Sequence, residues 1–313
     1  MFKDEILKDA SKGSKKERPW REKKLANLTY AEYLGVLNFK KSHNVSKCGE
    51  VLQFARTGDG LKLYQTWFCH SRLCPLCSWR RSMKNSFELR KILDEAYKKE
   101  PSAVFLFLTL TEENSRLGEL RDNLTAMNSS IYKLFKYKDV KRDLLGYVRS
   151  TEITVNRSNL TFHQHVHVLL MMKSSYFAKG HYLTQKDWSQ LWQRARKLDY
   201  VPVVNVKKVR ASKKDNSLVA SAKEVSKYQV KDYNYITDDK KGDLTVIDEL
   251  EHSLAGTRQI SFAGILKEIR HELLFDQKED DLINVDSEKD KNDVVDTVMF
   301  KWNSKVKNYI RWE

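Results

Sequence analysis

The chain has 313 residues, 57 of them basic and 42 acidic, so its formal net charge is +15, and 41% of its residues are hydrophobic. That hydrophobic fraction is enough for a folded core, yet no apolar run approaches the roughly 18 residues of a membrane-spanning helix, and the N-terminus lacks a secretory signal. The sequence therefore argues against a membrane partner and predicts a cytoplasmic chain of two domains, or of one domain with appendages.

The charge is unevenly distributed along the chain. Residues 276–296 hold nine acidic residues and three lysines, a net charge of −6, which leaves +21 for the remainder. An excess of this size favours a polyanionic partner, most simply nucleic acid, over a basic protein whose charge serves only solubility.

The pattern of charge and hydrophobicity divides the chain into five parts. Residues 1–28 are charged and aperiodic, which predicts a mobile basic arm, and a helix is expected within residues 30–41. The expected parts are a basic arm and helix (1–44), a zinc-binding hairpin and knuckle with a basic helix (45–100), a domain of strands and helices (101–275), an acidic linker (276–296) and an aromatic, basic segment (297–313). The last segment is predicted to form a hairpin.

All four cysteines lie in the second part. Cys69, Cys74 and Cys77 follow the spacing C-x4-C-x2-C, and Cys48 precedes two alternating apolar segments joined by TGDG. Those segments carry a hairpin signature, which would return Cys48 towards Cys69. A disulfide framework is not expected in a cytoplasmic chain. Four thiolates suit a closed structural zinc site better than four unpaired core cysteines, and His70 is a less favoured substitute ligand.

A basic helix is predicted directly after the cysteines, over residues 78–100. Such a run is often only a solvated helix face, but its position beside a zinc knuckle in a basic protein favours contact with DNA. The candidate phosphate contacts are Arg72, Arg80, Arg81 and Lys84.

From residue 103 strands and helices alternate regularly. Apolar and alternating segments predict strands, and apolar residues spaced by three and four predict helices. The expected order is strand 104–111, helix 117–134, strands 146–155 and 160–172 around the turn NRSN, helix 184–198, strand 201–209 and helix 217–236. This β-α-β-β-α-β order predicts an α+β fold of the ferredoxin-like, split βαβ type with an antiparallel sheet.

The stretch FHQHVHVLL places three histidines on one face of a strand. His163, His165 and His167 alternate with apolar residues, which share the opposite face. If NRSN is a symmetric turn, Glu152 faces His163 and lies diagonally from His165 on the same side of the sheet. Histidines and a carboxylate on neighbouring strands suit Mn²⁺ or Mg²⁺ acting on phosphate oxygens, and zinc fits this role less well. The alternative is a polar strand face that happens to be rich in histidine.

The stretch KEVSKYQVKD offers a nucleophile. At about 100° per residue, Glu224, Lys227, Tyr228 and Lys231 share one side of the predicted helix. A phenolate can attack a phosphodiester, and lysines favour the anions involved. Taken alone, the same pattern is also that of an ordinary amphipathic helix.

Four segments carry a resemblance to a known family. FLFLTLT, GYVRSTEITV, FHQHVHVLL and KEVSKYQVKD occur in the order and spacing of the replication initiators of small rolling-circle plasmids from Gram-positive bacteria. The chain resembles these single-tyrosine members of the HUH (histidine, hydrophobic residue, histidine) endonucleases over roughly residues 45–270, including CHSRLCPLCSWR and TRQISFAG. The resemblance implies that His165 and His167 hold the metal, and it ranks Glu152 above His163 as third ligand. It also implies that Tyr228 is the nucleophile and that Glu224 activates water at termination.

The resemblance further implies a substrate and partners. The substrate would be the double-strand origin of a plasmid, with its nick site exposed as single-stranded DNA in a hairpin loop. Tyr228 would become joined to the 5′ end and free a 3′-hydroxyl for a host polymerase, and a second cleavage and strand transfer would end the round. The chain lacks the nucleotide-binding pattern GxxxxGK[ST], so a host helicase would unwind the DNA.

Two other functions remain open at this point. A transposase or relaxase would share the metal ligands and the tyrosine but act in another process. A non-catalytic zinc-ribbon regulator would bind DNA without cleaving it and would leave Glu224 beside Tyr228 without a role. For the last 40 residues, origin recognition, contact in a homodimer and completion of the fold are all open.

Overall fold

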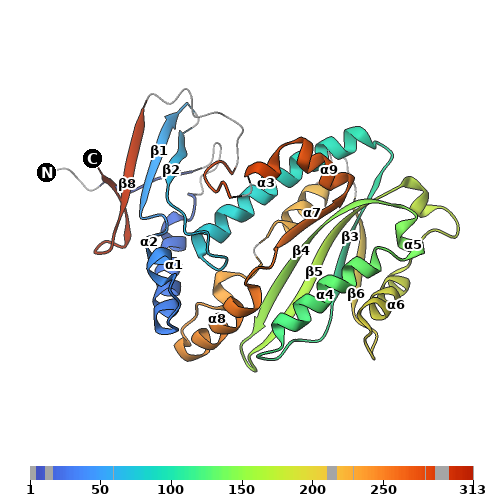
Figure 1. The fold of residues 1–313 in the computed structure, drawn as a ribbon. Coiled ribbons are helices and arrows are strands. Elements are labelled where there is room, and N and C mark those ends of the chain that lie inside the picture. The colour runs from blue at the N-terminus through green and yellow to red at the C-terminus, as the bar shows by residue number, and fades with distance from the viewer. Residues whose placement is uncertain are drawn as a thin grey trace. The chain divides into compact units, whose positions relative to one another are not determined.

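The computed structural model describes residues 5–10, 17–58, 60–209, 217–227, 229–278, 280–285 and 296–312 (Figure 1). The chain forms two compact units, residues 1–84 with 280–313 and residues 85–279. The boundary between them falls within helix α3 (Pro75–Lys99). The two ends of the chain therefore belong to one unit, whereas the sequence suggested five consecutive parts.

The first unit contains a four-stranded antiparallel sheet in the order β2-β1-β8-β9. Strands β1 (Val51–Thr57) and β2 (Gly60–Thr66) are the predicted hairpin between the cysteines. Strands β8 (Thr297–Asn303) and β9 (Asn308–Trp312) form the predicted C-terminal hairpin. Because β8 pairs with β1, the C-terminal segment completes the N-terminal sheet instead of forming a part of its own.

Two helices of this unit precede the sheet, α1 (Trp20–Val36) and α2 (Ser42–Lys47). Helix α1 begins at Trp20 rather than near Tyr30, so the prediction of an arm up to residue 28 is wrong. The Trp20 side chain is 2% exposed, its ring contacts that of Trp79, and its Nε1 donates to Asp9. The buried Trp20 side chain thus fixes the first turn of a helix that the charged sequence pattern did not predict.

The second unit contains a five-stranded sheet in the order β6-β3-β5-β4-β7, in which all neighbouring strands are antiparallel. Four of these strands were predicted. The fifth, β7, was not among the predicted strands, and helix α9 starts directly after it. The strands are β3 (Val104–Thr111), β4 (Leu144–Asn156), β5 (Thr161–Met172), β6 (Val204–Val209) and β7 (Ile260–Gly264).

Helices cover both faces of this sheet (Figure 1). Helices α4 (Leu120–Leu134) and α6 (Gln185–Arg196) pack on the face that carries Val166, Val168 and Leu170. The other face carries Leu169 and Met171 and packs against α7 (Ser217–Val225), α9 (Ile265–Glu272) and part of α3. The remaining helical elements are α5 (Lys138–Lys141), α8 (Lys240–Leu254), η1 (Ser174–Phe177), η2 (Asp232–Asn234) and η3 (Phe275–Lys278).

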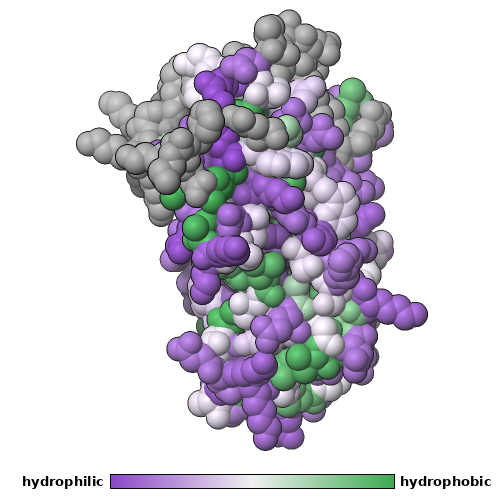
Figure 2. Space-filling view, turned by 90° about the vertical axis from the view of Figure 1, so that its left-hand side faces the viewer, coloured by the Kyte–Doolittle hydropathy of each residue, from purple (hydrophilic) through white to green (hydrophobic). Residues whose placement is uncertain are grey.

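The surface drawn in Figure 2 is mainly hydrophilic, and its hydrophobic residues form small separate groups. Within the described parts of the chain, no helix has the length and apolar character needed to cross a membrane. Apolar side chains are instead concentrated in the two layers of core on either side of the five-stranded sheet.

Candidate active site and cysteine centre

The register of the β4–β5 hairpin decides which side chains meet. Glu152 lies directly opposite His165, not opposite His163 as predicted. The turn comprises residues 157–160, because the Asn156 side chain accepts hydrogen bonds from Ser158 and Leu160 adopts a φ of 49°. The pairing is thus displaced by two residues from the predicted one. A displacement by two keeps every side chain on its face, so the predicted face of Glu152 is correct and its predicted partner is wrong.

Three side chains converge on this face in an arrangement that suits a divalent cation. The Nε2 atoms of His165 and His167 lie 3.4 and 3.2 Å from Oε2 of Glu152. All three ligand atoms lie within 4.8 Å of one another. His163 is not part of this group, because its Nδ1 pairs with Oδ1 of Asn114 at 3.0 Å. Two imidazoles and one carboxylate are donors that suit Mn²⁺ or Mg²⁺, and the binding of either ion here stays a prediction.

The surroundings of His167 favour the same interpretation. Its Nδ1 is 3.2 Å from Oγ1 of Thr109 on β3, and its ring stacks on Phe107. When Nδ1 donates to this hydroxyl, the lone pair of Nε2 is left free for a cation. Thr109 was not singled out in the sequence. Strand pairing identifies it, because Thr109 lies directly opposite His167 in the β3–β5 ladder.

A lysine completes the charge balance of the cluster. The ammonium group of Lys231 lies 3.0 Å from Oε1 of Glu152. Burial alone would raise the pKa of Glu152, but its hydrogen bonds with His165, His167 and Lys231 prevail and hold that pKa well below its usual range. Burial also opposes the charge of Lys231, yet contact with Glu152 raises the pKa of the lysine. The pair is therefore an ion pair at neutral pH.

The segment that carries the predicted nucleophile is not a continuous helix. Helix α7 ends at Val225, where the Ser226 hydroxyl donates to the carbonyl oxygen of Ala222. The Gln229 carbonyl then accepts the N–H of Ile153 on β4 at 2.8 Å. The prediction that one helix extends to residue 236 is therefore wrong, because α7 ends at Val225 and the carbonyl of Gln229 bonds to β4 instead of to a later turn of helix.

The predicted catalytic residues of this segment have different outcomes. Oε1 of Glu224 lies 3.9 Å from Nε2 of His167, and its other oxygen pairs with Lys227. Lys231 reaches Glu152 from beyond the end of the helix, not from the shared helix face that was predicted. Tyr228 lies outside the described residues.

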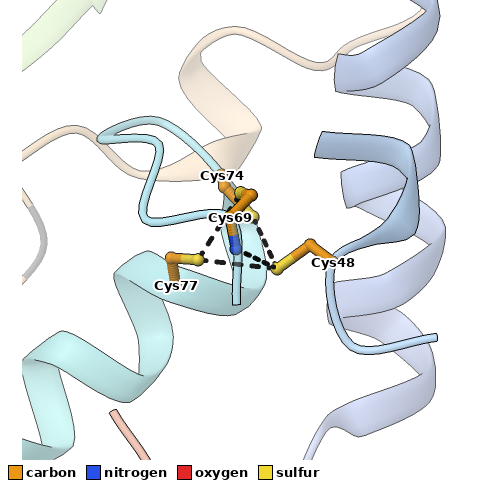
Figure 3. A group of neighbouring side chains, drawn as sticks. All are labelled: Cys48, Cys69, Cys74 and Cys77. Carbon is orange, nitrogen blue, oxygen red and sulfur yellow. Dashed lines mark hydrogen bonds between the residues drawn. The ribbon is translucent and has the colours of Figure 1, made fainter. Parts of the chain in front are cut away.

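The four cysteines converge in the first unit as predicted (Figure 3). The Sγ atom of Cys48 lies 3.5 Å from that of Cys77 and 3.7 Å from that of Cys74, and Cys69 lies 3.7 Å from Cys77. With Zn–S bonds of about 2.3 Å, the sulfurs of a tetrahedral site are about 3.8 Å apart. The two sulfurs of a disulfide would be about 2.05 Å apart, so the observed distances between the Sγ atoms fit a four-thiolate zinc site.

The surroundings of the sulfurs are also those of a metal centre. The side chain of Asn27 donates to Sγ of Cys74, and the N–H of Cys69 donates to Sγ of Cys48. Crowding raises the pKa of Cys48, above all through its hydrogen bond with Cys69, and burial raises the pKa of Cys77. Burial also opposes the thiolate of Cys74, but hydrogen bonds with the other three cysteines prevail and lower the pKa of Cys74. Without a metal, the negative charge is thus concentrated on Cys74, whereas coordination to Zn²⁺ would also remove the protons of Cys48 and Cys77.

The predicted DNA contacts fare less well. Arg80 is 2% exposed and donates to the carbonyl oxygens of Leu282 and Ile283 at 2.9 and 2.7 Å. Lys84 is also buried. Both side chains are buried, so their prediction as exposed phosphate contacts is wrong. Arg72 and Arg81 are partly exposed, and their contact with DNA remains a prediction.

Comparisons with known proteins identify the family of the chain. A family model described as a replication protein matches residues 60–310, which include Glu152, His165 and His167. A "Protein rep" from Lentilactobacillus hilgardii is 54% identical over 98% of this chain and 99% of its own length. Proteins of the same name from Lactiplantibacillus plantarum and Streptococcus pneumoniae are 51% and 38% identical, over 98% of this chain and 99% and 95% of their own lengths. No solved structure matches the chain.

Proposed function

Since the chain belongs to the Rep family of plasmid replication proteins, we propose that it starts rolling-circle replication by nicking the double-strand origin of a plasmid. The observation that carries this proposal is the cluster of Glu152, His165 and His167, with Glu224 and Lys231 in contact with it. A cation site beside a nucleophile suits the cleavage of a phosphodiester. A regulator that only binds DNA would have no use for such a cluster.

In the proposed reaction, the chain's own residues supply the nucleophile and hold the charges. Glu152, His165 and His167 would hold Mn²⁺ or Mg²⁺, and such an ion would supply polarisation of the scissile phosphate. The phenolic oxygen of Tyr228 attacks phosphorus and forms a bond to the 5′ side, while the bond to the 3′ oxygen breaks and that oxygen takes up a proton. The phosphotyrosine keeps the energy of the broken bond, so no ATP is required.

Glu224 is proposed to act at the end of the round. A tyrosine already joined to DNA cannot attack again, so a second cleavage needs another nucleophile, such as water activated by a carboxylate. Glu224 is partly exposed, lies close to His167 and has only Lys227 as an ion-pair partner besides it among the described residues. Strand transfer would then release a single-stranded circle.

The proposal extends to the fold and the cysteines. The order β6-β3-β5-β4, with α4 and α6 on one face, supports a ferredoxin-like arrangement of the second unit. The four cysteines are proposed to hold a structural Zn²⁺. The expected partners are origin DNA in the bacterial cytoplasm, a host helicase and a host polymerase. A transposase or relaxase would use the same chemistry, but the family match favours replication.

The test is a cleavage assay on single-stranded DNA that carries the nick site of the cognate origin, with Mn²⁺ present. We expect a denaturation-resistant protein–DNA adduct from the wild type and none from Tyr228→Phe, because phenylalanine lacks the attacking oxygen. Tyr233→Phe is the matched control: Tyr233 is close to Tyr228 in sequence and 64% exposed, and its substitution should still allow the adduct to form. A normal adduct from Tyr228→Phe would remove this tyrosine from the mechanism. DNA binding without any adduct in the wild type would favour a non-catalytic regulator.

A further inference from the structure

The two oxygens of Glu152 have different partners. Oε2 faces the imidazoles of His165 and His167, while Oε1 lies 3.0 Å from Nζ of Lys231. The carboxylate side chain is 9% exposed and the lysine side chain 30% exposed. One buried negative charge is thus shared between the cation ligands and an ammonium group that remains accessible to solvent.

A bound divalent cation would change this balance. Neutral imidazoles contribute no charge, so Glu152 alone cannot neutralise both a dication and Lys231. The second nearby carboxylate, Glu224, is already paired with Lys227. Two cations on one carboxylate repel each other, and the repulsion is strong where burial lowers the effective dielectric constant. Of the two cations, the one that can move away from Glu152 is the ammonium group of Lys231, because its side chain is flexible.

The backbone around Lys231 is fixed, so only its side chain needs to move. The carbonyl of Gln229 is bonded to Ile153 on β4, and the carbonyl of Lys231 accepts the N–H of Asn234 at 2.9 Å. The exposed ring of Tyr233 already lies beside the lysine, with its centre 5.8 Å from Nζ of Lys231, so the ammonium group keeps a neighbour when it leaves Glu152. An ammonium group over an aromatic ring is attracted to it.

We propose that Lys231 occupies Glu152 in the metal-free protein, is displaced when a divalent cation binds, and then becomes available to a phosphate of the DNA. This inference rests on the proposed function. It makes Lys231 a coupling residue, because the cation must displace the lysine and the displaced lysine favours DNA. Binding of the cation and binding of DNA then strengthen each other, as linkage requires.

The first experiment measures Mn²⁺ binding without DNA, by the electron paramagnetic resonance of free Mn²⁺. Lys231→Gln keeps a hydrogen-bond donor for Glu152 and removes the charge, so it should bind Mn²⁺ at least about tenfold more tightly. Lys223→Gln is the matched control, since Lys223 is exposed on α7, and it should bind as the wild type does. Glu152→Gln tests the site itself and should lose the binding. If Glu152→Gln binds normally, the proposed metal site is wrong. If Glu152→Gln loses binding while Lys231→Gln is unchanged or weaker, the inference on Lys231 is overturned.

The second experiment measures the coupling. A fluorescent single-stranded oligonucleotide with the cognate nick site is titrated with protein in the Tyr228→Phe background, with and without Mn²⁺. We expect Mn²⁺ to tighten DNA binding when Lys231 is present and to do so at least about threefold less in the double variant with Lys231→Gln. The Lys223→Gln double variant should keep the full effect. Equal tightening in all three proteins would show that Lys231 does not carry the coupling and would refute the inference.

Discussion

The buried lysine beside the cysteines allows a specific test of the proposed zinc centre. Lys24 on α1 is 1% exposed, and its ammonium group donates to the carbonyl oxygens of Ser46 and Cys48 at 2.8 and 2.7 Å. Burial lowers the pKa of Lys24, and the charges of Cys48 and Cys74 act in the opposite direction. Four thiolates around Zn²⁺ carry a net charge of −2. The loaded cluster therefore stabilises the ammonium group, and the ammonium group stabilises the loaded cluster.

The substitution Lys24→Met keeps much of the side-chain volume and removes the charge and both hydrogen bonds. It leaves one buried and one partly buried carbonyl group without these donors, at up to about 1–3 kcal/mol each, so the free energy of unfolding should fall by up to about 6 kcal/mol. Burial of the methionine offsets part of this loss, by up to about 2 kcal/mol. A net loss of a few kcal/mol would lower the melting temperature of the first unit by roughly 10 °C.

The assay combines calorimetry with the release of zinc to a chelating dye. We expect Lys24→Met to melt earlier and to release zinc faster than the wild type. Lys40→Met is the control, because Lys40 is exposed and a change there should alter neither quantity. Cys74→Ser should lose the metal altogether. Wild-type melting and wild-type zinc release in Lys24→Met would refute the electrostatic coupling between the lysine and the cluster.

Two other predictions concern the second unit. Glu224→Ala should nick DNA and become attached to it but fail to terminate the round of replication. Gel analysis of the replication products should therefore reveal DNA longer than one plasmid unit. Normal termination in this variant would reject the role of Glu224. Buried Asp143 should contribute to acid stability, because burial opposes its charge but hydrogen bonds from Ser175, His181 and Arg142 lower its pKa. A carboxyl group whose pKa is lower in the folded than in the unfolded state stabilises the fold above the unfolded-state pKa, and this stabilisation is lost as pH falls. Asp143→Asn should therefore reduce the loss of unfolding free energy below about pH 4. An unchanged dependence of the unfolding free energy on pH would contradict this.

The faces of the sheet were predictable from the sequence, while the partners across it were not. Alternation along FHQHVHVLL assigns His165 and His167 to one face whatever the register, because the period of a strand is two. The partner of Glu152 depends on the turn, and the turn is set by the side chain of Asn156 and the positive φ of Leu160. A sequence pattern does not contain these two features. The predicted face of Glu152, His165 and His167 is therefore confirmed, although the predicted pairing was wrong.

Charge patterns were less informative than strand patterns. The basic run after the cysteines indicated contact with DNA, yet Arg80 packs on the rings of Trp20 and Trp79 and donates to backbone carbonyl groups. The burial of Lys24 was likewise not predicted, because this residue lies in a charged segment that was expected to be mobile. Both residues are buried because each finds backbone acceptors supplied by distant parts of the chain. Such acceptors become visible only when the fold is known.

Strand β4 is the element that joins the proposed cation ligands to the segment of the proposed nucleophile. Glu152 belongs to β4, and the N–H groups on either side of it, those of Thr151 and Ile153, donate to the carbonyls of Gln259 and Gln229. The side chain of Gln259 also donates to the carbonyl of Lys227. Gln259 lies in TRQISFAG, a segment that supported the family resemblance without suggesting a role. Its role follows from these bonds, because they hold the backbone of residues 227 and 229 against the strand that carries Glu152. The distance between the cation ligands and the residues that flank Tyr228 is thus set by hydrogen bonds to one strand, and not by the periodicity of a helix.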